Sequence, residues 1–310
     1  MSKKHIVSLI IRTCKECNLG LFHIALQSII ENDYRPVEII AVVQSKNDNF
    51  IATLQAIINN INCSGIQTKL VVNNTSADER ARNLNLGIQV ATGRYLGFLD
   101  DDDILYPHHL SSLVNYLSHS EKIAWAYTDS ATAVCERRNT DQVVNVVSVE
   151  SPQHKRNFFS IKKLCENGFI PIHSYLIDRN KVSEELLYFD ESLKVLEDYA
   201  FMLKLAHSHL PEYIPVITCE YRFYTDASNS NFHVNQRLGK TYSGKMKMWR
   251  EAYQKVEKQK KQLFPSYRTP ILSFSTRSMI VAKFPILQRI KPYWKKVKKL
   301  ISSKTVKGQP

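Results

Sequence analysis

Strand-like and helix-like segments alternate along this chain, and that alternation is the feature that most restricts its fold. Residues 6–11 and 37–43 are continuous apolar runs, as in strands that are buried on both faces. Residues 21–30 and 50–61 instead repeat apolar side chains at helical spacing. The pattern predicts an α/β, Rossmann-like fold with a mostly parallel central sheet and helices on both faces. It does not give the order of the strands.

The same pattern extends along the chain. It predicts strands at residues 69–72, 95–99, 123–128, 173–177 and 216–224, and helices at 81–91, 107–117, 158–166 and from 196 to about 207. Gly93 is expected to end the helix at 81–91. With 310 residues, 44% of them hydrophobic, the chain can form one large α/β domain with an appendage or two small domains.

The strand expected at residues 95–99 runs directly into four consecutive aspartates, Asp100 to Asp103. Carboxylates packed side by side repel one another unless a cation or solvent offsets their charge. Ligands of α/β proteins bind at the carboxyl ends of the strands, and a hard divalent cation takes oxygen ligands. The run therefore predicts a metal site, with a solvated turn or the acidic start of the next helix as the alternative.

Positive charge is concentrated at the end of the chain. The formal net charge is +13, but residues 241–310 alone hold 18 Lys and Arg and 2 Asp and Glu, so the first 240 residues are mildly acidic. Cations alternate with aromatic and aliphatic residues at 291–301, which is typical of an interfacial helix on an anionic bilayer. A solvated or disordered tail is the alternative. Nucleic acid is not expected as a partner, although basic charge alone does not identify the polyanion.

The cellular compartment follows from what the sequence lacks. The first residues do not have the layout of a signal peptide, and no apolar run is long enough to span a membrane. The six cysteines are scattered along the chain. These features predict a cytoplasmic chain with reduced thiols.

Four motifs follow one another along residues 5–225. They are VSLIIRT at 7–13, EIIAVV at 38–43, NLGI and ATGRY running into LDDDD at 85–103, and FDE followed by ED at 189–198. Each is weak by itself, but four in order at compatible spacing form a specific signal. By these motifs the chain resembles a family 2 glycosyltransferase of the GT-A fold, of the bacterial surface-polysaccharide type.

The resemblance implies how the chain is divided. Residues 1–240 would form the GT-A domain, with a nucleotide-sugar half over about 1–130 and an acceptor half over about 131–240. Residues 241–310 would form a basic, partly amphipathic helical region. Family members that decorate lipid-linked glycans often work as peripheral proteins, which implies a place on the inner face of the cell membrane.

The resemblance also gives the aspartates roles. A nucleotide-sugar donor leaves as an anionic diphosphate, and Mn²⁺ or Mg²⁺ helps it to leave. Asp102 is expected to contact the metal directly. Asp100 is expected beside the metal and the ribose or sugar of the donor, Asp101 on the donor, and Asp103 as a further acid next to the metal. The choice among the four stays open.

The acceptor hydroxyl must lose its proton as it attacks the sugar, and a positioned carboxylate that accepts this proton contributes roughly 10²–10⁴-fold. The resemblance places this base in the pair Glu197-Asp198 at a helix start, with Asp198 as the base. One direct displacement inverts the anomeric configuration. The alternative is that the two acids only complement the helix dipole.

Further residues are candidates for the nucleotide sugar. Thr13 and Asn85 match family positions, although Asn85 could instead cap or pack. Arg80 or Arg82 could bind phosphate through a fork of donors, or could be solvated residues at a helix start.

The sequence departs from the family pattern at two places. Arg12 stands where the family usually has proline, and Val43-Gln44 replaces the paired acids after the second strand. Gln44 carries both a donor and an acceptor, so it could still read a pyrimidine edge. The identity of the nucleotide stays open, with a UDP-sugar preferred.

The sequence thus predicts a metal-dependent, inverting glycosyltransferase. It would move a sugar to a hydroxyl of a glycan or lipid-linked glycan in surface polysaccharide, lipopolysaccharide or capsule synthesis. One alternative is a catalytically degenerate GT-A domain that binds a membrane or another polyanion. A second is an isoprenoid-type diphosphate enzyme, which should be all-helical. His173 could line the acceptor site, but a structural histidine is the preferred interpretation.

Overall fold

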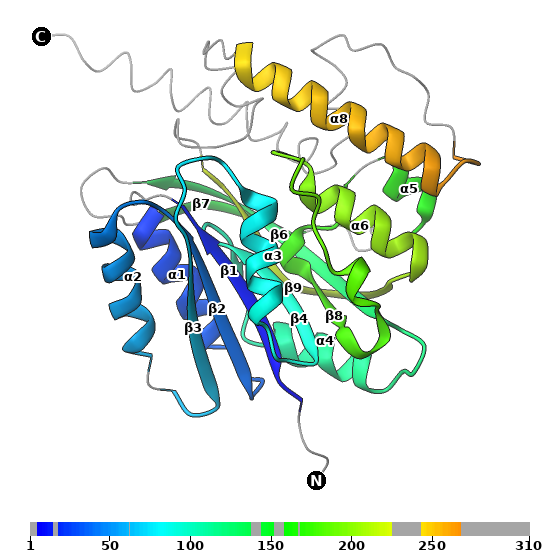
Figure 1. Ribbon diagram of the computed structural model, residues 1–310. Coiled ribbons are helices and arrows are strands. Elements are labelled where there is room, and N and C mark those ends of the chain that lie inside the picture. The colour runs from blue at the N-terminus through cyan, green and yellow to red at the C-terminus, as the bar shows by residue number, and fades with distance from the viewer. Residues whose placement is uncertain are drawn as a thin grey trace, which may run out of the picture. The chain divides into compact units, whose positions relative to one another are not determined.

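The computed structural model describes residues 5–14, 18–61, 63–137, 144–151, 158–166, 168–224 and 243–267 (Figure 1). The chain divides into two units, one of Met1–Phe159 with Ile170–Pro265 and one of Ser160–Phe169 with Ser266–Pro310. In the described part of the second unit there is one short helix, α5 (Ile161–Glu166). The sheet and the aspartate run belong to the first unit.

The first unit opens with strands and helices in strict alternation: β1 (Val7–Thr13), α1 (Leu19–Ile30), β2 (Val37–Gln44), α2 (Asp48–Asn59), β3 (Ile66–Asn73), α3 (Arg80–Val90) and β4 (Tyr95–Asp100). It continues with β5 (Ile104–Leu105), α4 (His109–Ser118), β6 (Trp125–Arg137), β7 (Val144–Glu150), β8 (Tyr175–Asp178), α6 (Glu197–Ser208), β9 (Glu212–Tyr224) and α8 (Ser243–Leu263). The predicted alternation is confirmed.

The strands form one sheet in the order β3-β2-β1-β4-β8-β6-β9-β5, with β7 paired to β6. Strands β3, β2, β1 and β4 are parallel neighbours, whereas β8 runs antiparallel to both β4 and β6. β1 lies inside the parallel half, and Arg12 is its only residue that is not buried. Because β4 lies next to β1, Arg12 and Asp100 are in register at the carboxyl edge of the sheet.

Helices cover both faces of the sheet, as predicted (Figure 1). The core on one face combines α1, α2 and α4 with alternate strand residues such as Leu9. On the opposite face, Gly87 of α3 stands against Ile10 of β1. Phe201 of α6 packs edge-on against Phe98 of β4 on this same face. The parallel strands are therefore buried on both sides, which accounts for their continuous apolar sequences.

A buried carboxylate fixes the amino-terminal edge of the sheet. Glu38 accepts hydrogen bonds from Ser8 Oγ at 2.5 Å and from the amide and hydroxyl of Thr92 at 2.8 and 2.9 Å, and Lys69 Nζ lies 2.6 Å away. Ser8 Oγ also accepts from the Gly93 amide at 2.8 Å. A Cβ on Gly93 would lie 2.8 Å from the Ser8 nitrogen, so this close approach requires glycine.

Two details of the expected elements are wrong. Gly93 does not end α3, which stops at Val90, and serves the close approach to β1 instead. The strand expected at residues 173–177 starts at Tyr175, because Ile172–Ser174 forms a 3₁₀ turn. The sequence pattern also does not predict β5, whose two residues are too few to show a periodicity.

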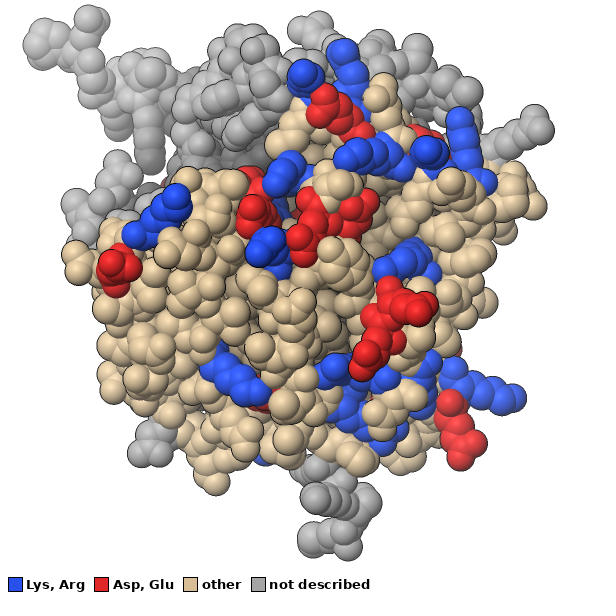
Figure 2. All heavy atoms as spheres, in the orientation of Figure 1, with Lys and Arg blue, Asp and Glu red and all other residues tan. Residues whose placement is uncertain are grey.

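α8 packs on α6 in the first unit. Gln259 Nε2 donates to the Ala200 carbonyl at 3.1 Å, and Phe264, just after α8, packs edge-on against His207. In the region of α8, Figure 2 shows mainly basic side chains with a few acidic ones between them. The exposed cations of this helix are Lys247, Arg250, Lys255, Lys258 and Lys261. Within the described ranges, no helix is long and apolar enough to cross a membrane. The basic stretch at 291–301 lies outside them.

We expect Gly93→Ala to lower the free energy of unfolding by about 1–3 kcal/mol, because the new methyl group must displace backbone atoms of β1. Urea unfolding followed by circular dichroism measures the change. Ala52→Ser, on the exposed side of α2, is the control and should leave the midpoint unchanged. A wild-type midpoint for Gly93→Ala would show that the segment before β4 is not held against β1.

Candidate active site

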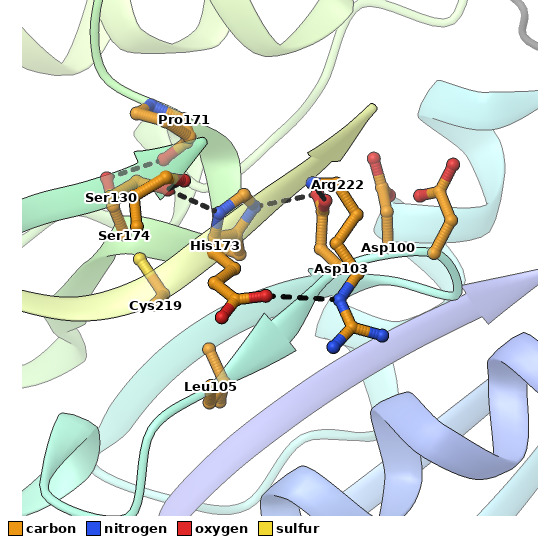
Figure 3. Close-up of polar contacts among 12 residues, drawn as sticks. Asp100, Asp103, Leu105, Ser130, Pro171, His173, Ser174, Cys219 and Arg222 are labelled. Carbon is orange, nitrogen blue, oxygen red and sulfur yellow. Dashed lines mark hydrogen bonds and ion pairs between the residues drawn. The ribbon is translucent and has the colours of Figure 1, made fainter. Parts of the chain in front are cut away.

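The four aspartates form a packed corner at the carboxyl edge of the parallel strands. Asp100 ends β4, and the next residues turn toward β5. Strand β9 holds this turn. Figure 3 shows Arg222 of this strand beside Asp103, and the Arg222 amide donates to Asp103 Oδ1 at 2.7 Å. The Tyr224 hydroxyl donates to the Asp102 carbonyl at 3.4 Å. The acidic run is therefore built into the fold and is not a solvated turn.

Three of these aspartates could share a cation. Asp100, Asp102 and Asp103 each offer a carboxylate oxygen, and these oxygens lie within 4.8 Å of one another. Burial, and after it the charges of the neighbouring aspartates, raise the pKa of Asp102 well above its usual value. A divalent cation would offset that repulsion, and the all-oxygen donor set fits Mn²⁺ or Mg²⁺.

Arg12, near the end of β1, joins Asp100 to the acid pair of α6. Its guanidinium donates to Asp100 Oδ1 and Oδ2 at 2.6 and 3.2 Å, and to Glu197 Oε1 at 2.9 Å. Burial acts to raise the pKa of Asp100, but the charge and hydrogen bonds of Arg12, together with the charges of Arg80 and His173, lower it below its usual value. Asp100 is therefore held ionised, with both oxygens engaged.

His173 holds Asp103 in place. Its Nδ1 lies 2.9 Å from Asp103 Oδ2, and its Nε2 lies 3.3 Å from the Ser130 hydroxyl (Figure 3). Its ring also stacks on Tyr221 of β9, with 6.4 Å between the centroids. Burial acts to lower the pKa of His173, but Asp103 and Cys219 together raise it well above the usual value. The imidazole is thus a charged structural partner of the aspartate run.

Asp101 has different partners. Thr13 Oγ1 donates to Asp101 Oδ2 at 2.6 Å, and Asn18 Nδ2 lies 3.3 and 3.2 Å from the two oxygens. Burial raises the pKa of Asp101 to about 6. The structure therefore brings together Thr13 and Asp101, both expected on the nucleotide sugar, and binds them to each other.

A left-handed residue sets the start of α6. Leu196 has a φ of 64°, the only positive value for a non-glycine residue in the described chain. Such a residue costs about 1–3 kcal/mol and persists where the surrounding structure enforces it. It is followed by Glu197, bound by Arg12, and by Asp198, which accepts from the Tyr199 amide at 2.7 Å. Burial, and after it the charge of Glu197, raise the pKa of Asp198 to about 7.

Gln44 shapes the loop before α3. Its Nε2 donates to the Ala77 carbonyl, and its Oε1 accepts from the Glu79 amide at 3.1 Å and from Asn83 Nδ2 at 2.8 Å. Both ends of the amide that was expected to read the nucleotide are therefore engaged within the protein. Gln44 therefore holds the loop before α3 in place.

Asn85 ties α3 to the segment before α6. Its Oδ1 accepts from the Phe189 amide at 2.8 Å, and its Nδ2 donates to the Phe189 carbonyl and to Glu191 Oε1, both at 2.9 Å. The packing alternative for Asn85 accounts for all of these contacts.

The two candidate phosphate-binding arginines differ in their surroundings. Arg80 Nε donates to Asp78 Oδ1 at 3.2 Å. Burial acts to lower the pKa of Arg80, but the charge of Glu197, followed by that of Asp78, raises it. Arg82 is 52% exposed, and its nearest acids, Glu79 among them, lie 3.6 Å or more away. Arg80 therefore lies in the field of the site, whereas Arg82 is largely a solvated residue.

Three residues at the site carry no motif that points to their role. Arg12 lies within the VSLIIRT motif, but the sequence argument treats it only as a departure from the family pattern and gives it no role. The Tyr175 hydroxyl is buried and has no hydrogen-bond partner among the described residues, and burial, then the charge of Asp198, raise its pKa. Burial and then Asp103 raise the pKa of Tyr221. The two tyrosines come from β8 and β9, and the strand order that places them here is not readable from sequence.

Comparison with known proteins gives the same family and fold as the motifs. Residues 8–186 match the family model of Glycosyl transferase family 2. Escherichia coli WfaP, named as a UDP-Glc:alpha-D-GlcNAc-diphosphoundecaprenol beta-1,3-glucosyltransferase, is 26% identical over 203 residues, which are 64% of this chain and 70% of WfaP. The chain spans from 47% to 70% of the length of the curated relatives that it matches.

Two solved structures are alike in fold. Staphylococcus aureus TarS (residues 1–349, with UDP-GlcNAc) has a TM-score of 0.59 at 14% identity, over 82% of this chain and 66% of that one. The mannosyltransferase PcManGT of Pyrobaculum calidifontis, with GDP-Man and Mn²⁺, has a TM-score of 0.51 at 16% identity, over 96% and 84%. The predicted GT-A fold is confirmed. Because the family model also matches more than half of its length, this chain belongs to glycosyl transferase family 2.

Proposed function

We propose that this chain is a metal-dependent, inverting glycosyltransferase that moves a sugar from a UDP-sugar to a hydroxyl of a glycan acceptor. One observation carries the proposal: Arg12 binds both Asp100, in the aspartate run, and Glu197, in the acid pair of α6. Acids suited to a metal-bound diphosphate and a carboxylate suited to proton transfer therefore lie at one edge of the sheet, where α/β proteins bind their ligands.

On the donor side, Asp102 is the proposed direct ligand of Mn²⁺ or Mg²⁺. Its oxygen lies within 4.8 Å of oxygens of Asp100 and Asp103, which add negative charge beside it. When bound, the cation neutralises the diphosphate as it leaves. Arg80 and the loop held by Gln44 form the proposed binding surface for the nucleotide. Residues 1–130 as a whole are the proposed donor half.

On the acceptor side, Asp198 is the proposed base. A pKa of about 7 makes its carboxylate largely ionised just above neutral pH and still able to take a proton. Asp198 accepts the proton of the acceptor hydroxyl while that oxygen attacks the anomeric carbon opposite the diphosphate, so that one displacement inverts the configuration. Residues 131–240 are the proposed acceptor half.

The names of similar proteins support the choice of substrates. WfaP is named for UDP-Glc and TarS was solved with UDP-GlcNAc, whereas PcManGT was solved with GDP-Man. WfaP is also named for a diphosphoundecaprenol acceptor. We therefore prefer a UDP-sugar donor and a lipid-linked acceptor in surface polysaccharide synthesis. The proposed location is the inner face of the cell membrane, reached through the basic region at 241–310.

Asp102→Asn should weaken Mn²⁺-dependent UDP binding at least tenfold, because the amide keeps the shape of the side chain but loses the charge that a divalent cation requires. Calorimetry with UDP, GDP, dTDP and CMP, each with and without Mn²⁺, measures this. Asp48→Asn on the exposed start of α2 is the control. Equal binding by Asp102→Asn and wild type would reject the metal assignment. Absence of nucleotide binding by the wild type would favour a degenerate GT-A domain.

Asp198→Asn should keep UDP–Mn²⁺ binding and lower the rate of sugar transfer by about 10²–10⁴-fold, because the amide cannot accept the proton. The release of UDP from UDP-glucose and UDP-GlcNAc measures the rate. In the wild type, kcat/KM should fall about tenfold per pH unit below a pKa near 7, since Asp198 is protonated there. A normal rate in Asp198→Asn would remove the base assignment.

Removal of residues 291–310 should weaken binding to vesicles that contain anionic lipid, because each basic residue near such a surface contributes about 1 kcal/mol. The difference should shrink as salt rises, since salt screens surface charges. Co-sedimentation with anionic and with neutral vesicles measures both effects. A shortened chain that sediments as well as the full chain would end the proposal that this segment binds the membrane.

A further inference from the structure

Arg12 lies between two acids that come from different parts of the chain. It lies on β1 in register with Asp100 of β4, at the edge where both strands end. Its side chain is 13% exposed, and the Glu197 side chain that it binds is 4% exposed. One planar guanidinium thus satisfies two acids from different parts of the chain, because its donors are arranged as a rigid fork.

The partners of the aspartate run leave one of its metal-candidate acids available. Both oxygens of Asp100 face Arg12, and those of Asp103 face His173 and the Arg222 amide. For Asp102, the described part of the chain offers its carboxylate no hydrogen bond beyond its own backbone amide. Asp100 therefore anchors the corner through Arg12, whereas the Asp102 carboxylate can take a ligand.

The same guanidinium reaches the acid pair of α6. Within the described residues, Arg12 is the only side chain that hydrogen-bonds both the aspartate run and this pair. The helix starts after a left-handed leucine, Leu196, so its first turn depends on contacts made by the residues that follow. Glu197 makes that contact with Arg12, and Asp198 is the next residue.

We propose that Arg12 is a positioning residue, which sets the distance between the donor-side aspartates and the base by holding Asp100 and Glu197 with one guanidinium. The proposal rests on the proposed function and extends it to a residue that departs from the family pattern. By holding Glu197, Arg12 fixes the position of the next residue, Asp198. A displacement of about 1 Å at a reacting group can cost 10²-fold in rate, so loss of this link should lower the rate of transfer more than it weakens donor binding.

The chain offers a matched control at the other end of β4. Arg94 donates to Asp178 Oδ1 and Oδ2 at 3.0 and 2.8 Å, and the Asp178 side chain is fully buried. This pair also joins a guanidinium to both oxygens of an aspartate, with Lys181 Nζ a further 3.1 Å from Asp178 Oδ2, but it lies away from the aspartate run. Arg94→Met therefore reports what the loss of such a pair does to stability alone.

The test compares Arg12→Met, Arg12→Lys and Glu197→Gln with Arg94→Met. Calorimetry gives the dissociation constant of UDP with Mn²⁺, and release of UDP from UDP-glucose and UDP-GlcNAc, with water as acceptor, gives kcat. We expect Arg12→Met to lower kcat about 100-fold and to change the dissociation constant less than about threefold. Glu197→Gln should show the same pattern. Arg12→Lys should recover part of kcat, because lysine keeps the charge but cannot form both contacts.

Amide hydrogen exchange without any ligand gives a second measurement. Arg12→Met should speed exchange in the first turn of α6, whereas Arg94→Met should not. Equal kcat values for Arg12→Met and Arg94→Met would overturn the proposal, and so would a loss confined to the dissociation constant, which would make Arg12 a donor ligand. A wild-type chain that binds no nucleotide and releases no UDP would reject the proposed function and this role with it, while the exchange data would still report the structural link.

Discussion

The crowding of four carboxylates at the end of β4, two of them buried and two half-buried, is the constraint on which the rest of the site depends. Their mutual repulsion must be offset wherever water is excluded. The chain does this with separate partners for three of the four: Arg12 for Asp100, Thr13 and Asn18 for Asp101, and His173 for Asp103. Asp102 is left with the strongest reason to attract a cation, and its raised pKa expresses that imbalance.

Carboxylates at the two edges of the parallel sheet serve different purposes, one for stability and one for function. At the amino edge, Glu38 is buried but receives bonds from Ser8, Thr92 and Lys69, so its pKa is lowered although burial acts to raise it. At the carboxyl edge, Asp198 is held by one backbone amide and its pKa is raised. A fully satisfied acid stabilises the fold, whereas an incompletely satisfied acid can exchange a proton or bind a ligand.

The sequence could predict whatever depends on neighbours along the chain. The apolar strands, the amphipathic helices and the acidic run have local patterns, and the motif order identified the family. It could not predict that Arg12 faces Asp100, because that needs β4 to pair with β1. Nor could it predict that His173 reaches Asp103, since this depends on a 3₁₀ turn ahead of β8. The partners of Gln44 could not be predicted either, because the loop before α3 meets Gln44 only in the folded chain.

The two departures from the family pattern both make the charge at this edge of the sheet more positive. Replacing paired acids by Val43-Gln44 removes negative charge, and replacing proline by Arg12 adds positive charge. A domain that had lost its activity would gain nothing by keeping buried charges, because each unpaired one costs several kcal/mol and apolar replacements are often as stable. Here the added guanidinium is paired on both sides, with Asp100 and Glu197. This complete pairing favours a site that is built around Arg12 over a catalytically degenerate domain.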